Sequence, residues 1–197
     1  MKYSILIILF CLNISYGQEK KAKSILTFKP EFSLYAIVPN NFGDNYLAKA
    51  NEPHIGIGTN FNVVQIQNFR LGMGYDYIYY SITDISRAGN IGNSRYNSFY
   101  GILAYEIKLW NEFYLQPYLG LGTTNLNFKS GDRSFGHQTG TDFRIGCNID
   151  FKLDKTVSAF AGIGFVSTNY NINTAPELIS FYDNSKMLQI NIGIKLN

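Results

Sequence analysis

The chain has 197 residues, a formal net charge of +3 at pH 7, and 46% hydrophobic against 16% charged residues. Because a nucleic-acid-binding surface needs strong and local positive charge, this balance argues against nucleic acid as a partner. The length suits a single domain.

The first 17 residues have the parts of a secretory signal peptide. Lys2 provides a basic start, an apolar run covers residues 4–14, and Ser15-Tyr16-Gly17 forms a small-x-small cleavage site. The apolar run of about 11 residues is too short for a membrane-spanning helix, which needs about 20. We therefore expect a cleaved signal peptide over 1–17, a short periplasmic segment over 18–24 and one domain over 25–197.

Period-two alternation of apolar and polar residues fills the rest of the chain and predicts β-strands. Eight strands are predicted, at about 25–37, 54–64, 69–82, 98–109, 113–126, 141–153, 156–168 and 186–197. The last strand ends with the chain, so its free edge needs a partner, and we expect it to pair with the first strand.

The connections between these strands alternate in length. Tight turns are predicted at 65–68, 110–112 and 154–155, and long polar loops at 38–53, 83–97, 127–140 and 169–185. Short periplasmic turns and long outer loops are typical of outer-membrane barrels. The sequence therefore predicts an all-β fold, an eight-stranded antiparallel up-and-down transmembrane β-barrel.

One face of each predicted strand is apolar and carries no charge. In the last strand this face holds Leu188, Ile190, Ile192, Ile194 and Leu196. Because a Lys or Arg on the lipid face costs about 2–4 kcal/mol at mid-bilayer, the absence of charge indicates a surface that contacts outer-membrane lipid.

The opposite face is polar and rich in glycine, and we interpret it as the lining of a narrow lumen. Buried charges are expected to pair, so we predict a polar network there rather than a wide pore. The predicted network consists of Lys29, Glu31, Arg70, Asp76, Glu106, Lys108, Asp142, Arg144, Asp150 and Lys152. Its periplasmic half is expected to form a plug of Lys29, Glu31, Arg70, Glu106, Lys108, Asp150 and Lys152. Lys195 shares this face, which makes six basic and five acidic residues.

Two prolines lie inside predicted strands. Pro30 and Pro117 cannot donate a backbone hydrogen bond to a neighbouring strand. The alternation keeps its phase across both residues, so we retain the strands. We expect the strand pairing to be interrupted locally at each proline.

These features resemble the small outer-membrane β-barrel family of the OmpA and OmpX type, and the related porin-family barrel domains. The resemblance covers nearly all of the mature chain and is most specific at Gln116-Pro117-Tyr118-Leu119-Gly120-Leu121-Gly122 and at 188–197. It implies an integral outer-membrane protein of a Gram-negative bacterium, recognised by the barrel-insertion machinery through its C-terminal strand. The family commonly ends in an aromatic residue, whereas this chain ends in Leu196-Asn197, a departure that concerns the insertion signal.

The sequence favours a structural or surface-interaction role, in which the long loops contact a ligand. Three alternatives stay open: a small-solute porin or channel, a lipid-modifying enzyme of the outer membrane, and a soluble lipocalin-like binder whose apolar face points inward. An enzyme would have only His54 and His137 as candidate bases. No cofactor or metal is implied, because two distant histidines and an outward Cys147 make no metal site.

Overall fold

The computed structural model describes residues 26–196. The expected signal peptide (1–17), the expected periplasmic segment (18–24), residue 25 and residue 197 lie outside the described residues.

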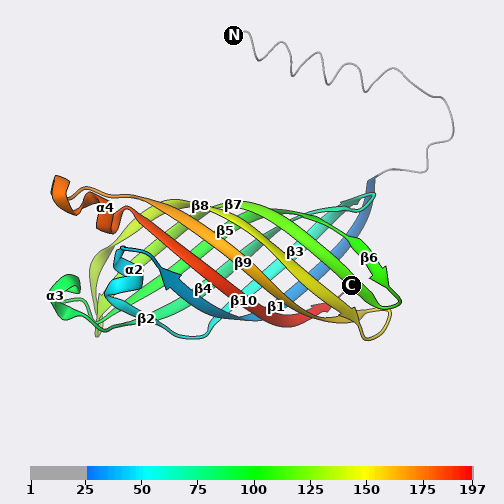
Figure 1. Cartoon of the computed structure of the whole chain (residues 1–197), viewed down its shortest axis with the longest axis horizontal. Helices are drawn as coiled ribbons and strands as arrows, with labels where there is room; N and C mark the ends of the chain where they lie inside the picture. The colour runs from blue at the N-terminus through cyan, green and yellow to red at the C-terminus, as the bar shows by residue number, and fades with distance from the viewer. Residues whose placement is uncertain (1–25, 197) are drawn as a thin grey trace, which may run out of the picture.

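Eight long strands form an antiparallel ring around an elongated interior (Figure 1). They are β1 (Leu26–Phe42), β3 (Gly56–Ile66), β4 (Phe69–Ile82), β5 (Asn93–Tyr105), β7 (Phe113–Ser130), β8 (Arg133–Lys152), β9 (Val157–Asn171) and β10 (Asn184–Leu196). Shorter elements are β2 (Asn51–Pro53), β6 (Ile107–Trp110), α2 (Tyr46–Lys49), α3 (Ile85–Ala88), the 3-10 helix η1 (Pro176–Leu178) and α4 (Ile179–Tyr182). None of the helices in residues 26–196 is long and apolar enough to cross a membrane.

The strand order follows the chain around the ring, and the last strand returns to the first. β10 pairs with β1 from Phe32↔Leu196 to Phe42↔Lys186. The expected partner of the last strand is therefore confirmed. The fold is an all-β antiparallel sheet with an eight-strand ring.

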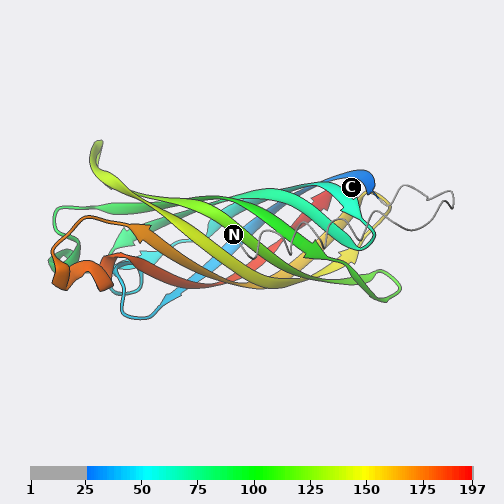
Figure 2. The same ribbon diagram turned by 90° about the horizontal axis from the view of Figure 1, so that it is seen from above.

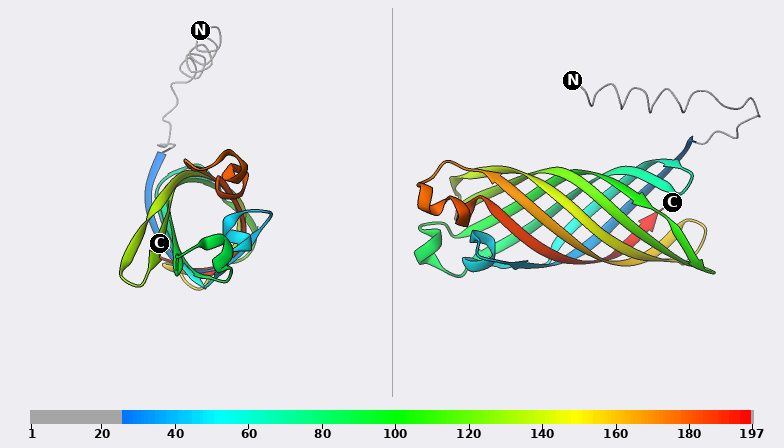
Figure 3. Two further views of the ribbon diagram at one scale, coloured as in Figure 1. Left: turned by 90° about the vertical axis from the view of Figure 1, so that its left-hand side faces the viewer. Right: turned by 45° about the horizontal axis from the view of Figure 1, so that its top comes forward.

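The two ends of the ring differ in how the strands are connected. At one end, here called the turn end, tight turns join β3 to β4, β6 to β7 and β8 to β9, and Gln67 and Asn111 take the positive φ that short hairpin turns need. The other end, the loop end, carries α2, α3 and α4 (Figure 3). This separation follows the predicted alternation of short and long connections.

The prediction of a long loop over residues 127–140 is wrong. Most of it continues β7 and β8 as a paired hairpin up to Ser130↔Arg133, with Gly131 at a φ of 57° in the turn. This hairpin projects beyond the ring and leans away from it (Figures 2 and 3). Polar residues occupy both of its faces, so it lacks the two-faced pattern by which the other strands were recognised.

Both strand prolines interrupt the pairing, as predicted. The register between β1 and β3 shifts between Phe28 and Glu31, the interval that contains Pro30. Opposite Pro117, pairing with β7 stops after Ala104 and resumes at Ile107, so the predicted strand 98–109 is divided into β5 and β6. Each missing N–H removes one hydrogen bond from the sheet.

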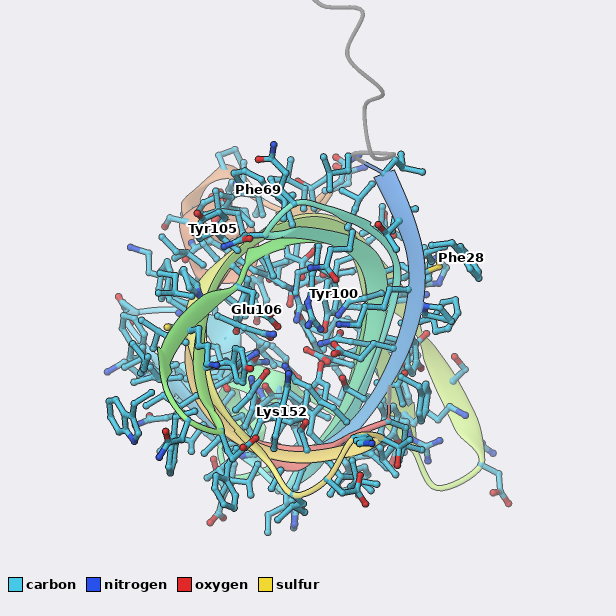
Figure 4. The ribbon with its side chains drawn as sticks, turned by 90° about the vertical axis from the view of Figure 1, so that its right-hand side faces the viewer. Phe28, Phe69, Tyr100, Tyr105, Glu106 and Lys152 are labelled. Atoms are coloured by element: carbon cyan, nitrogen blue, oxygen red, sulfur yellow. The ribbon has the colours of Figure 1, made fainter. Side chains whose placement is uncertain are left out.

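The apolar faces of the strands point outward and the charged faces point inward. Leu121, Phe28 and Ile57 are 70%, 69% and 51% exposed. Viewed from the turn end, Phe28, Phe69 and Tyr105 point away from the ring, whereas Tyr100, Glu106 and Lys152 point into it (Figure 4). The lipocalin-like alternative is therefore wrong, because it requires the apolar face inside.

Candidate functional site

Arg144 on β8 is the centre of one buried network in the interior. Its guanidinium bonds the carboxylate of Asp76 and, at 2.7 Å and 2.8 Å, the Oδ2 of Asp142. All three side chains are almost completely buried. Strands β4 and β8 are not adjacent in the ring, so the Asp76 to Arg144 pair crosses the interior.

Two tyrosines complete this Arg144 network. The hydroxyl of Tyr35 donates to Asp76 Oδ1 at 2.7 Å and lies 2.7 Å from the hydroxyl of Tyr100. The guanidinium of Arg144 lies over the Tyr100 ring at 3.7 Å, a cation–π contact. Ser98 donates to Asp142 at 2.8 Å. The network therefore joins four strands, β1, β4, β5 and β8, across the interior of the ring.

A second network lies nearer the turn end and centres on Arg70 of β4. Arg70 bonds the carboxylates of Glu31 on β1 and of Glu106, which lies in the break between β5 and β6. Asn62 donates to the remaining Glu31 oxygen at 2.8 Å. Removing one partner of such a buried pair costs about 3–5 kcal/mol, because the other charge stays buried and unpaired.

Gln116 and Lys195 extend this Arg70 network across the ring. The Gln116 amide donates to Glu106 at 3.4 Å and accepts from Lys195 Nζ at 2.5 Å. Lys195 also pairs with Asp150 at 2.7 Å. The sequence placed Lys195 on the inward face but left it out of the predicted plug, and it did not anticipate Gln116 as the connecting residue.

Three predicted members of the plug lie outside both networks. Lys29 and Lys108 are exposed and form none of the ion pairs found within residues 26–196. Lys29 lies in the bulge at Pro30, and Lys108 lies on β6 next to a tight turn. Lys152 is half-buried and lies over the Tyr114 ring at 4.0 Å. At the turn end of the ring, inward-facing positions are open to solvent. Water can therefore solvate a cation there, and the cation needs no carboxylate partner.

The two networks consequently carry an excess of acid. They contain five carboxyl groups (Glu31, Asp76, Glu106, Asp142 and Asp150) and three cations (Arg70, Arg144 and Lys195), a formal charge of −2 when all are ionised. The sequence predicted six basic and five acidic residues in the interior. The two networks hold only three of the basic residues, because Lys29, Lys108 and Lys152 belong to neither network.

The loop end of the interior is apolar, which the sequence did not predict. Ile37, Ile78, Tyr80, Leu126 and Met187 point inward and are at most 2% exposed. We call these residues, with Tyr46 and Leu47 of α2, the apolar plug. The ring of Tyr46 packs edge-on against Phe128 at 5.6 Å and lies 5.5 Å from Tyr182 of α4. In stretches such as Tyr77-Ile78-Tyr79-Tyr80, apolar residues occupy both faces, so alternation could not reveal the inward set.

A small cavity lies next to the Arg144 network. It has a volume of about 10 Å³ and is lined by Tyr35, Tyr118, Asn148 and Asn191, among others. The side-chain oxygens of both asparagines are buried and have no hydrogen-bond partner among the described residues. A space of this size holds about one water molecule.

The two histidines lie apart from the interior networks. The His54 Nε2 is 2.8 Å from the Ser81 hydroxyl at an exposed position, and the His54 ring lies 5.3 Å from the Tyr79 ring, tilted by 58°. None of the ion pairs formed by the described residues includes His54. His137 is exposed on the hairpin of β7 and β8. The structure thus brings one serine and one histidine together but does not bond the histidine to an acid.

Within the part of the chain that the structure describes, no group of three or more His, Cys, Asp or Glu residues could hold a metal ion.

Comparison with solved structures finds proteins of the same fold. Neisserial surface protein A (NspA) has a TM-score of 0.62 and 13% identity, over 85% of this chain and 96% of its own. AlkL has a TM-score of 0.52 and 11% identity, over 91% and 94%. Ail of Yersinia pestis has a TM-score of 0.50 and 14% identity, over 86% and 97%. No model of a protein family and no curated protein matches the sequence. At these identities the likeness shows the fold, an eight-strand ring like those of outer-membrane barrels.

Proposed function

We propose that the chain is an integral outer-membrane β-barrel protein with a filled interior, whose role is structural or lies in interaction at the cell surface. It is not proposed to be an enzyme. The short turns would face the periplasm and the loop end the outside, as in barrels with an even number of strands.

The observation that carries this proposal is the outward apolar band. Large aliphatic and aromatic side chains on every long strand of the ring are exposed, for example Ile192 at 59% and Ile163 at 57%. A soluble protein rarely exposes a continuous apolar patch of more than a few hundred Å². A ring of paired strands satisfies its own backbone hydrogen bonds, which is what a membrane-spanning segment requires. The expected signal peptide agrees with this location.

The filled interior favours the structural or surface role over a channel. The Arg70 network, the Arg144 network and the apolar plug occupy the interior in succession from the turn end to the loop end. Wide aqueous channels take about 16 strands, and eight strands leave room for little more than side chains. A small-solute porin is therefore the less favoured alternative.

The loop end is the proposed surface for a partner. Ile85, Phe135, Leu178 and Ile179 are 71%, 48%, 44% and 41% exposed there. Loops and hairpins on a rigid scaffold are where binding commonly resides. The C-terminal strand β10, with its alternating pattern, is the proposed contact for the barrel-insertion machinery.

The membrane location is tested with a charge placed on the apolar band. Ile192→Arg puts a cation on the outward face of β10 and is expected to lower insertion into lipid vesicles, because Arg costs about 2–4 kcal/mol at mid-bilayer. The matched control is Asn127→Arg, on the outward face of the hairpin beyond the band, which should insert like the unmodified chain. Insertion is read from the change in gel mobility between unboiled and boiled samples.

The same preparation separates the alternatives. Insertion without conductance in planar bilayers supports a filled barrel, and large stable conductance supports the porin instead. Equal insertion of Ile192→Arg and Asn127→Arg, or no mobility change on boiling in any sample, would contradict the membrane location itself.

A further inference from the structure

A groove of about 740 Å³ crosses the outward surface of β4, β5, β7, β8 and β9. The side chains that define it here include Asn97, Thr123, Asn125, Thr139, Thr141 and Asn169. These side chains point outward and alternate with inward ones such as Asp142, although the inward residues Ser98 and Thr124 also line the groove.

The strand register builds the groove from two neighbouring rows. Thr123 pairs with Thr141 and Thr141 with Asn169 in the row nearer the turn end. In the next row, Asn97 pairs with Asn125 and Asn125 with Thr139. Paired residues on one face of a sheet lie about 4.5–5.5 Å apart, so these short side chains form a continuous shallow channel.

The position of the groove relates it to the apolar band. One row nearer the turn end, Leu121 pairs with Phe143, and both are exposed, at 70% and 44%. One row nearer the loop end, Arg95 pairs with Asn127 and Asn127 with His137. The groove therefore follows the border at which the outward surface changes from apolar to polar, which in a membrane is the level of the lipid headgroups.

The chemistry of the groove is neutral and rich in hydrogen-bonding groups. Both hydroxyl and amide side chains line it, and none of the described residues that line it is charged. The Tyr75 hydroxyl donates to Asn97 Oδ1 at 2.7 Å, and the Phe99 ring is 56% exposed beside it. Asn125 Oδ1 is buried and has no hydrogen-bond partner among the described residues. An unpaired buried acceptor favours a ligand that brings a donor.

We propose that this groove binds the sugar headgroup of an outer-leaflet glycolipid, with the acyl chains of that lipid lying along Leu121 and Phe143. The inference rests on the membrane location proposed above. Sugar hydroxyls both donate and accept, which suits the Thr and Asn side chains, and an aromatic ring packs against the apolar face of a sugar. A phosphate group alone would need cations, and an acyl chain alone would not need the amides.

The test compares three reconstitutions of the full chain. Phosphatidylethanolamine vesicles are prepared alone, with lipopolysaccharide, or with the free oligosaccharide released from that lipopolysaccharide. The protein is extracted in mild detergent, and co-purified glycan is measured by native mass spectrometry. We expect retention from the lipopolysaccharide vesicles only.

Two variants narrow the result to the groove. Thr141→Leu and Asn125→Leu fill it with apolar side chains and should each lower retention by about five- to tenfold, the effect of losing one or two hydrogen bonds. Ser167→Leu is the matched control, because Ser167 pairs with Phe143 on the same outward face but does not line the groove. It should retain glycolipid like the unmodified chain.

Each result decides one proposal. Unchanged retention in Thr141→Leu and Asn125→Leu, or equal capture of the free oligosaccharide, would overturn the glycolipid site while the heat-dependent mobility shift still upheld the barrel. Loss of that shift in the unmodified chain would overturn the membrane location instead.

Discussion

The guanidinium carbon of Arg144 lies 3.7 Å from the centre of the Tyr100 ring. Asp76 and Asp142 bond the same guanidinium, so one side chain holds two carboxylates and an aromatic ring inside the sheet. Arg is suited to this position because its planar group can stack and donate several hydrogen bonds at once.

Replacing this arginine should destabilise the protein strongly. Arg144→Met leaves Asp76 and Asp142 buried without a cation, and we expect the free energy of unfolding to fall by about 3–5 kcal/mol. Urea unfolding in lipid vesicles measures the change. Combining Arg144→Met with Asp76→Asn and Asp142→Asn should restore much of the loss. A single variant as stable as the unmodified chain would show that the network is not formed.

The pair of Lys195 and Asp150 should be energetically coupled. In a double-mutant cycle of Lys195→Met and Asp150→Asn, we expect a coupling free energy of about 0.5–3 kcal/mol, the range for residues in contact. Lys108→Met is the comparison, because Lys108 is exposed on β6, and it should change stability by no more than about 0.5 kcal/mol. Additive single effects would indicate that the Lys195 ammonium does not contact Asp150.

Opening the loop end alone should not create a pore. Tyr46→Ser with Leu47→Ser weakens the apolar plug, but the Arg144 and Arg70 networks remain across the interior. We expect no stable current in planar bilayers from this double variant. Discrete channel openings would mean that the apolar plug, rather than the Arg70 and Arg144 networks, closes the interior.

Ser81 should not behave as a catalytic nucleophile. It lies 2.8 Å from His54 Nε2, but His54 forms no ion pair with any described carboxylate that would orient and stabilise its ring. We expect no covalent labelling by a fluorophosphonate probe, with Ser81→Ala as the blank. Labelling that disappears in both Ser81→Ala and His54→Ala would identify an enzyme.

The turn between β8 and β9 should loosen in acid. Hydrogen bonds from the backbone N–H groups of Thr156 and Val157 keep the pKa of Asp154 below its usual value. A lowered pKa in the folded state means that the carboxylate stabilises the turn above the ordinary pKa of about 3.9, and that this is lost as the pH falls through the lower value. Amide exchange at Thr156 and Val157, measured against pH, checks this. Asp154→Asn should remove the dependence, and an unchanged pH profile in that variant would contradict the assignment.

The sequence predicted the long strands well because the outside and the interior of the ring require side chains of opposite polarity at neighbouring positions. The strand 69–82 was predicted with the bounds of β4, since Phe69 to Tyr77 alternate without a break. Beyond the apolar band both faces of the strands carry polar residues, so the sequence shows no alternation there. The hairpin around Gly131 was therefore assigned to a loop. Backbone pairing there continues without a periodic signal in the side chains.

The interior could be predicted only as a set of inward residues. Which carboxylate bonds which cation depends on strand register and on contacts across the ring, and alternation specifies neither. Lys195 and Gln116 meet although they are 79 positions apart. Lys29 and Lys108 have the inward phase but lie near the ends of their strands, where solvent replaces a partner. The apolar plug was hidden because both faces are apolar in that region.

The paired hairpin of β7 and β8 forms a stiff arm at the loop end of the ring. A disordered loop of the same length would fold back over the mouth of the ring, whereas cross-strand hydrogen bonds hold this one extended up to Gly131. Phe135 and His137 are thereby held on the arm, away from the mouth of the ring. In the proposed membrane location, the distance that the protein reaches from the bilayer is thus set by sheet geometry and not by chain length.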